Sequence, residues 1–216
     1  MENNSKLFEG KKILVLGAHP DDVELGCGGA IAKLIEEGQE VFYIVFSKCE
    51  KSIPEGFPKN ILEEEVKKAA GKLGIKKENI KVLSYPVRDF PQYRQDILED
   101  LVKLRKEINP DIIFLPSSYD FHQDHITIYE EGLRAFNQRT ILGYELPWTN
   151  RFFGYSAFMA LDEKYLEIKI EAIKNYASQS KRKYMNSEFI KGWANMRGMQ
   201  SNTKYAEAFE TIQLKL

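Results

Sequence analysis

The sequence predicts an α/β fold, a three-layer sandwich in which helices cover both faces of a mostly parallel sheet. Two observations predict it. Short, continuous apolar runs, the first at residues 11–17, are typical of strands buried on both faces. Segments with apolar residues at helical spacing alternate with these runs along the chain, and such alternation indicates a parallel sheet with right-handed crossovers.

The first half of the chain carries the clearest pattern. Four buried strands are predicted, at residues 11–17, 41–46, 80–85 and 111–116. A helix begins at Gly28 and closes at Gly38, as glycine C-caps do. A charged amphipathic helix at 63–73 ends at Gly74, and a third helix at 93–108 is stopped by the Asn109-Pro110 pair.

The second half is less regular. We expect a helix at 126–136, a fifth strand at 141–146, a helix at 163–176, a last helix up to Met196 and a final strand at 210–216. The sequence contains no linker, internal repeat or low-complexity segment, so we expect one domain spanning residues 1–216. The arrangement is Rossmann-like.

The composition of the chain excludes some classes of protein. With 43% hydrophobic and 29% charged residues the chain resembles an ordinary globular protein, and 31 basic against 32 acidic residues give no field directed at nucleic acid or an anionic membrane. No apolar run of about 18 residues could span a bilayer, and residues 1–12 lack the apolar centre of a signal peptide. Two cysteines, Cys27 and Cys49, form no disulfide framework. We therefore expect a cytoplasmic protein, and leave open whether it forms a homo-oligomer.

All three histidines lie in two short acidic clusters, His-Pro-Asp-Asp at 19–22 and His-Gln-Asp-His at 122–125. The first cluster directly follows the first predicted strand and the second follows the fourth. In open α/β sheets, ligands bind beyond the carboxyl ends of the strands. Both clusters should therefore meet at one edge of the sheet, where histidine and carboxylate could bind a metal or move protons.

The spacing of the residues within each cluster suggests which of them could bind a metal. In a helix-like turn His19 and Asp22 face the same side, so that one aspartate ligates and Asp21 remains free. His122 and His125 are also three apart, and either or both could reach the centre. Two imidazoles and one carboxylate satisfy a catalytic zinc, and metal-bound water with a pKa of about 7 is a nucleophile. This set of histidines and carboxylates fits the hydrolysis of a carbonyl or phosphoryl compound.

Residues 18–29, Ala-His-Pro-Asp-Asp-Val-Glu-Leu-Gly-Cys-Gly-Gly, together with the 122–125 cluster, resemble the PIG-L (LmbE-like) family of zinc-dependent N-deacetylases. The stretch at 205–209 is also similar to the family's. Members remove acetyl groups from N-acetylglucosamine-type compounds, so the resemblance implies a small amino-sugar substrate. One departure is that Val23 stands between the paired aspartates and Glu24, where many members carry Glu, and it leaves the role of Glu24 open.

The resemblance also implies roles for individual residues. His19, Asp22 and His125 would bind zinc, and Asp21 would be the general base that takes a proton from the metal-bound water. A protonated His122 would stabilise the oxyanion, and Asp124 would orient a neighbouring histidine. Because two imidazoles and a carboxylate also suit ferrous iron, Fe²⁺ remains an alternative metal.

Several alternatives stay open. Asp21 could simply cap the following helix, and His122 could be a fourth ligand that closes the site. The chain could instead be a zinc amidase that cleaves a larger amide, or a metal-free nucleotide- or sugar-binding module. The glycines at 26–29 lie too far beyond the strand for a dinucleotide fingerprint, so close helix packing explains them better.

A few further residues could contact the substrate. Arg88 follows the third strand near the same edge, where it could bind a phosphate, carboxylate or sugar hydroxyl. Tyr144 and Trp148 could stack on a sugar ring or pack in the core. The basic run at 181–183 is typical of a solvated surface.

Overall fold

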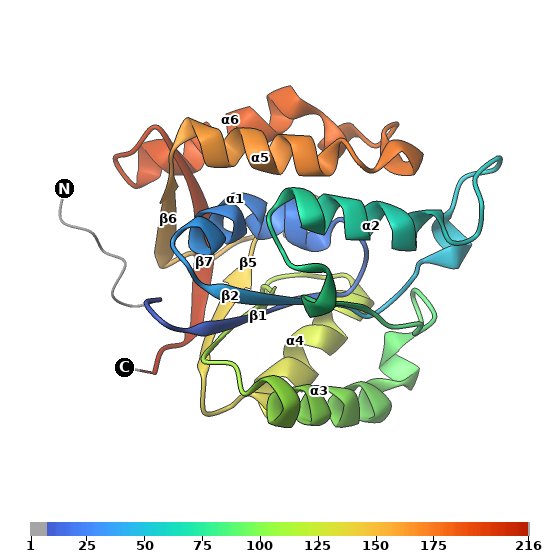
Figure 1. Ribbon diagram of the computed structural model, residues 1–216. Helices are drawn as coiled ribbons and strands as arrows, with labels where there is room; N and C mark the ends of the chain where they lie inside the picture. Colours follow the sequence, from blue (N-terminus) through green and yellow to red (C-terminus); the bar gives the residue numbers. More distant parts are fainter. Residues whose placement is uncertain (1–7, 216) are drawn as a thin grey trace.

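A computed structural model describes residues 8–215 and shows one seven-stranded sheet between two layers of helices (Figure 1). The strands are β1 (Lys12–Gly17), β2 (Glu40–Val45), β3 (Ile80–Val82), β4 (Ile112–Pro116), β5 (Thr140–Tyr144), β6 (Ala157–Leu161) and β7 (Tyr205–Gln213). The helices are α1 (Asp22–Glu36), α2 (Ile61–Lys72), α3 (Arg94–Ile108), α4 (Gln123–Ala135), α5 (Glu163–Ile173) and α6 (Ser187–Gln200). The predicted α/β class is confirmed.

The strands follow the order β3-β2-β1-β4-β5-β7-β6. β1 to β5 pair in parallel, whereas β7 runs antiparallel to both β5 and β6. The chain builds outward from β1 through β2 to β3 and then returns to the other side of β1 with β4. The order of the strands therefore reverses between β1 and β4, and the crevice at such a reversal is where open α/β sheets bind ligands.

Each face of the sheet has its own apolar core. α1, α2, α5 and α6 lie on one side in Figure 1 and α3 and α4 on the other. Val15 on β1 packs into the core of the first side, and its neighbours Leu14 and Leu16 pack into the core of the second. The alternation of strand side chains between faces thus explains why the whole run had to be apolar.

Several predicted boundaries were wrong. The strand expected at 80–85 is only Ile80–Val82, the last strand begins at Tyr205 rather than 210, and β6 was not predicted. Residue 216 lies outside the described part of the chain. The first helix begins at Asp22 rather than Gly28. The prediction was wrong because the first turns bury Asp22 and Glu24, and a pattern of apolar residues does not show that charged residues are buried.

α1 is kinked at Cys27. Cys27 leaves helical geometry with φ −147° and ψ 19°, which frees backbone N–H groups of the following turn. The carboxylate of Glu207 on β7 accepts hydrogen bonds from the N–H groups of Gly29 at 3.0 Å and Ala30 at 2.6 Å, and it pairs with the buried Lys169 at 2.6 Å. Glu207 therefore acts as an internal cap in the middle of the helix.

The glycines of α1 serve close packing, as expected. A Cβ atom on Gly26 would lie 2.4 Å from the ring of Tyr144, and one on Gly29 would lie 2.5 Å from Leu161. Both distances are shorter than real contacts, so no larger residue fits without movement. Cys27 is fully buried and unpaired, so it packs as a small core residue.

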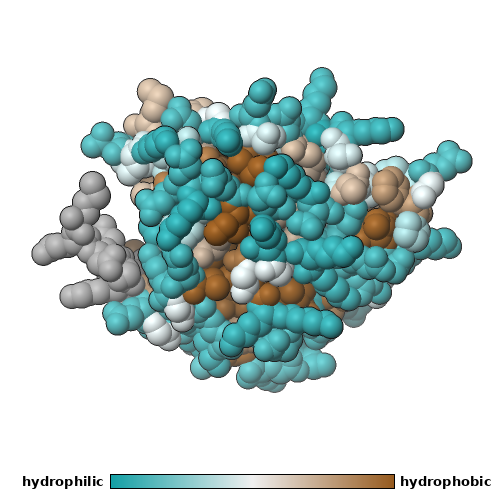
Figure 2. Space-filling view, turned by 45° about the horizontal axis from the view of Figure 1, so that its top comes forward, coloured by the Kyte–Doolittle hydropathy of each residue, from teal (hydrophilic) through white to brown (hydrophobic). Residues whose placement is uncertain are grey.

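On the face seen in Figure 2, most exposed residues are hydrophilic, and hydrophobic residues lie between them in small patches. Among residues 8–215, no helix combines the length and the apolar character needed to cross a membrane.

Candidate active site

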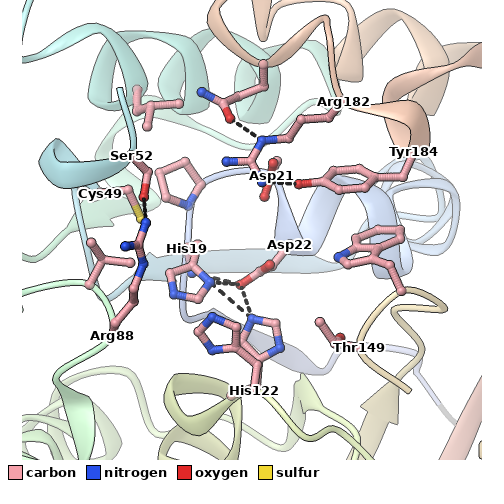
Figure 3. Close-up of a pocket in the computed structure, with 16 residues that line it drawn as sticks. His19, Asp21, Asp22, Cys49, Ser52, Arg88, His122, Thr149, Arg182 and Tyr184 are labelled. Carbon is pink, nitrogen blue, oxygen red and sulfur yellow. Dashed lines mark hydrogen bonds and ion pairs between the residues drawn. The ribbon is translucent and has the colours of Figure 1, made fainter. Parts of the chain in front are cut away.

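The two histidine clusters meet at the carboxyl ends of β1 and β4. His19 lies in the turn after β1 and Asp22 opens α1, while His125 lies in the first turn of α4. Figure 3 shows His19, Asp22 and His122 directed toward one another from these elements. The expectation that both clusters share one edge of the sheet is confirmed, and the reversal of strand order places them side by side.

Three donor atoms form a small triangle. Nδ1 of His19 lies 3.1 Å from Nε2 of His125, and Oδ2 of Asp22 lies 3.4 Å from the first atom and 3.3 Å from the second. In a tetrahedral zinc site with bonds of about 2.0–2.2 Å, ligand atoms are about 3.3 Å apart. The three atoms thus have the separation of ligands that share one ion.

The remaining nitrogen of each ring is held by a carboxylate. Nε2 of His19 lies 2.9 Å from Oδ2 of Asp124, and Nδ1 of His125 lies 2.7 Å from Oδ2 of Asp120. An imidazole that donates from one nitrogen presents the lone pair of the other. The two carboxylates therefore select the tautomers in which the triangle atoms are free to bind a metal, as carboxylates do behind metal-ligating histidines.

Negative charge concentrates around His125. Burial alone would lower the pKa of this histidine, but the carboxylates of Asp22 and Asp120 raise the pKa to about 10. The position therefore favours a cation, which can be a proton or a metal ion that displaces it.

Asp21 is held apart from the triangle in an unusual backbone conformation. Its φ is 91°, in the left-handed region, and its N–H donates to the hydroxyl of Tyr176 at 3.0 Å. The side chain makes no hydrogen bond to the start of α1, so the alternative that Asp21 caps this helix is not what the structure shows. Burial, followed by the charge of Asp22, raises the pKa of Asp21 well above its usual value.

His122 is the N-cap of α4. Its Nδ1 accepts a hydrogen bond from the N–H of Asp124 at 3.2 Å, so a neutral ring carries its proton on Nε2. Burial, then the charges of His125 and His19, lower the pKa of His122 to about 4. The ring is therefore neutral near pH 7, whereas the family resemblance implied a protonated ring.

The three histidines also form a cluster of their own, since one ring nitrogen from each lies within 4.8 Å of the others. Two sets of metal ligands are thus available, which share His19 and His125 and differ in Asp22 or His122. The Asp22 set has the shorter separations, at most 3.4 Å, and each of its histidines has a carboxylate behind it. On geometry we favour Asp22.

A cavity of about 200 Å³ opens above these residues. Arg88 lines one wall, while Arg182 and Tyr184 line the wall across the pocket (Figure 3). Trp148 also lines the cavity and stacks on Tyr184 with ring centroids 4.0 Å apart. Tyr144, the other aromatic candidate, is fully buried and donates to a backbone carbonyl of β1, so it belongs to the core.

Arg88 is fixed through its backbone. The N–H of Arg88 donates to Oδ2 of Asp124 at 2.6 Å, and that of Phe90 donates to Oδ1 at 3.3 Å. Asp124 therefore couples the loop after β3 to His19. Arg88 itself has φ 72°, a left-handed conformation that costs about 1–3 kcal/mol and that surrounding contacts must maintain.

Sequence reasoning missed four residues of the site. Asp120 precedes the second cluster by two residues, and its position next to a histidine motif was a usable signal. Tyr176, Arg182 and Tyr184 come from the segment between α5 and α6, where the basic run at 181–183 was expected to be only a solvated surface. The tertiary fold brings Arg182 and Tyr184 to the cavity and the buried Tyr176 to the backbone of Asp21.

The fold and the site together define an α/β protein with an acidic, histidine-containing pocket at the reversal of a parallel sheet. Residues 14–136 match the PIG-L family, described as GlcNAc-PI de-N-acetylase. This chain belongs to the PIG-L family, as the resemblance of its two clusters implied.

Relatives support the assignment along most of the chain. The uncharacterized deacetylase YaiS of Escherichia coli is 31% identical over 78% of this chain and 91% of its own length. The diacetylchitobiose deacetylase of Thermococcus kodakarensis is 25% identical over 97% of this chain and 86% of its own. The structure of N,N'-diacetylchitobiose deacetylase from Pyrococcus horikoshii, 23% identical, superposes with a TM-score of 0.80 over 96% of this chain and 85% of that one. The last comparison shows a shared fold.

Proposed function

We propose that this protein is a zinc-dependent hydrolase that removes the N-acetyl group from an N-acetylglucosamine-type amino sugar or its conjugate. The observation that carries the proposal is the triangle of Asp22 Oδ2, His19 Nδ1 and His125 Nε2, with Asp21 lining the same cavity and not engaged in capping. Family membership, with relatives named as deacetylases, supports the same reaction.

His19, Asp22 and His125 would hold the metal. Three protein ligands leave a position for water or substrate, as catalytic zinc requires. Bound there, Zn²⁺ would polarise the amide carbonyl and lower the pKa of water to about 7. The same donors suit Fe²⁺, so the identity of the ion is part of the proposal.

Asp21 would take the proton of the attacking water and pass it to the leaving amine. A carboxylate with a raised pKa is a stronger base than an ordinary aspartate, so it holds the proton of the water better before passing it to the amine. Tyr176 fixes the backbone of Asp21, which lines the same cavity as the triangle.

His122 would stabilise the negative charge that develops on the carbonyl oxygen. Since its Nδ1 accepts the N–H of Asp124, the Nε2–H of the neutral ring is the group available for donation. Asp124 would orient His19, and Arg88, on the cavity wall, would bind the sugar or its substituent.

The size of the cavity favours hydrolysis of a small N-acetyl group over hydrolysis of a bulky amide. About 200 Å³ is below the roughly 300–1,000 Å³ of sites for drug-sized ligands, and it suits one sugar ring with its acetamido group. A zinc amidase for larger amides remains the second candidate of the enzyme class.

Acetate release tests the proposal. The zinc-loaded protein is incubated with matched N-acetyl, N-butyryl and N-benzoyl glucosamines, and the free acid and amine are measured together. We expect equal amounts of acetate and amine from the N-acetyl sugars and at least about tenfold less turnover with the benzoyl amide. Preferred cleavage of the benzoyl amide would indicate an amidase, and binding of sugars without any hydrolysis would indicate a binding module.

A further inference from the structure

We infer that the substrate carries an oxyanion, a phosphoryl or carboxylate group, close to its N-acetyl group, and that Arg182 and Arg88 bind it. The inference rests on the proposed function, because it names the substrate class of the same pocket. It comes from how the two guanidinium groups on the cavity walls are held.

Arg182 is fixed by neutral partners. Its Nε donates to Oε1 of Gln179 at 2.5 Å and its Nη1 donates to the hydroxyl of Tyr184 at 2.7 Å. Tyr184 is itself stacked on Trp148, with an angle of 11° between the rings. Two of the five N–H donors of the guanidinium are thus used, which orients the group and leaves the others free for a ligand.

Arg88 faces the same cavity from the loop after β3. Its Nη2 donates to Oγ of Ser52 at 3.3 Å, again a neutral partner. The backbone bond to Asp124 fixes the start of this side chain. Across the pocket in Figure 3, Arg88 and Arg182 therefore present two oriented cations to one space.

The charge of Arg182 lowers the pKa of Asp21, but neither guanidinium group forms a salt bridge within the described residues. Within residues 8–215, no carboxylate oxygen lies within 4.0 Å of the guanidinium nitrogens of Arg88 or Arg182. By contrast, Arg94 and Arg134 pair with Glu131, and Arg197 pairs with Glu145. Arg105 and Arg139 also bond only to neutral oxygens, so what distinguishes Arg88 and Arg182 is that both line the cavity where a ligand would enter.

Two guanidinium groups that line one cavity favour an anionic ligand. Guanidinium groups bind phosphate and carboxylate through paired, charge-assisted hydrogen bonds. Lys181 and Lys183, which flank Arg182 along an adjoining hollow, extend the positive field outward.

The test uses binding to metal-free protein, so that no oxyanion can bind a metal. Isothermal titration compares the methyl glycoside of N-acetylglucosamine, which is neutral, with N-acetylglucosamine 1-phosphate, N-acetylglucosamine 6-phosphate and N-acetylmuramic acid. We expect at least one anionic sugar to bind about ten- to a hundredfold more tightly than the neutral one. The sugar that binds best distinguishes a phosphoryl from a carboxylate group and its position.

Substitutions assign the preference to the two arginines. R182Q and R88Q should each reduce the ratio of anionic to neutral affinity several-fold. R139Q, which removes the same charge beside the start of β5, should leave the ratio unchanged. A ratio near one in the wild type would overturn the inference. So would an R182Q variant that weakens neutral and anionic sugars equally, because Arg182 would then act only on Asp21, whose pKa it lowers.

Turnover separates this inference from the proposed function. If the zinc-loaded protein releases acetate from neutral and anionic sugars with equal kcat/KM, deacetylation stands and the anionic substrate class is wrong. If no sugar is hydrolysed, the proposed function fails, while the affinity ratio of the metal-free protein still decides whether the arginines bind an oxyanion.

Discussion

Nε2 of His19 lies 2.9 Å from Oδ2 of Asp124, although 105 residues separate them in the sequence. This contact joins the two histidine clusters and leaves Nδ1 of His19 free to bind a metal. We expect D124N to weaken zinc binding about ten- to a hundredfold, because outer carboxylates set the orientation and basicity of ligating histidines. Competition with a chromogenic chelator measures the affinity.

D111N is the matched control for this substitution. Asp111 accepts the N–H of Lys12 at 3.0 Å, far from the site at the amino end of β4, and an asparagine oxygen can replace it. Zinc affinity should therefore stay at the wild-type value. Equal affinity of D124N and the wild type would show that Asp124 has no role behind His19.

Asp21 should be needed for turnover and not for the metal. We expect D21N to retain zinc and to lose about 10²- to 10⁴-fold in kcat, the usual contribution of a general base. Zinc content and acetate release are measured on the same preparation. If D21N hydrolyses N-acetyl sugars at the wild-type rate, the proton acceptor is another group.

The glycines of α1 and α2 offer a test of packing. G29A should lower the free energy of unfolding by about 1–3 kcal/mol, because its Cβ would lie 2.5 Å from Leu161. G71A, in α2, has no atom within 4 Å of the new Cβ and should raise stability by about 0.5–1 kcal/mol. Urea unfolding of the metal-free proteins measures both. Equal stability of G29A and G71A would contradict the packing role of Gly29.

Glu24 should make stability depend on pH. Oε2 accepts the hydroxyl of Tyr43 at 3.0 Å, while Oε1 has no hydrogen-bond partner among residues 8–215. Burial raises the pKa of this carboxyl from 4.5 to about 7. The folded protein therefore holds a proton that the unfolded chain releases, so this contribution to stability is present below about pH 4.5 and is lost as pH rises to about 7.

E24Q isolates that contribution. The glutamine cannot ionise, so the metal-free variant should lose less stability than the wild type between pH 4.5 and 7. The difference should be on the order of 3 kcal/mol at most. Urea unfolding across this range provides the measurement, and parallel curves for the two proteins would show that Glu24 does not titrate in it.

The central part of the fold could be predicted because its strands are buried and their residues are accordingly apolar. The run at 11–17 is apolar at every position that faces either core, and the clusters that follow β1 and β4 had to share an edge once the sheet was parallel. β6 was missed because four of its five residues are only partly buried. The start of α1 was missed because its first turns bury the charged residues Asp22 and Glu24. The cap that Glu207, 177 residues from Ala30, forms at the kink is likewise encoded by no local pattern.

The site divides in the same way. Candidate residues inside the two clusters could be named from their types and spacing. Arg182 and Tyr184 could not, because they reach the cavity only when α5 and α6 pack over α1 and α2. The protonation of His122 also depends on tertiary contacts, since burial and two neighbouring rings lower its pKa.

The central claim is that Asp22, and not His122, is the third metal ligand. The zinc content of single variants tests this claim most directly. Elemental analysis of purified protein should give about one zinc per chain for the wild type and for H122A. D22A and H125A should retain almost none. A variant pattern in which H122A loses the metal and D22A retains it would contradict the assignment and establish the three-histidine set instead.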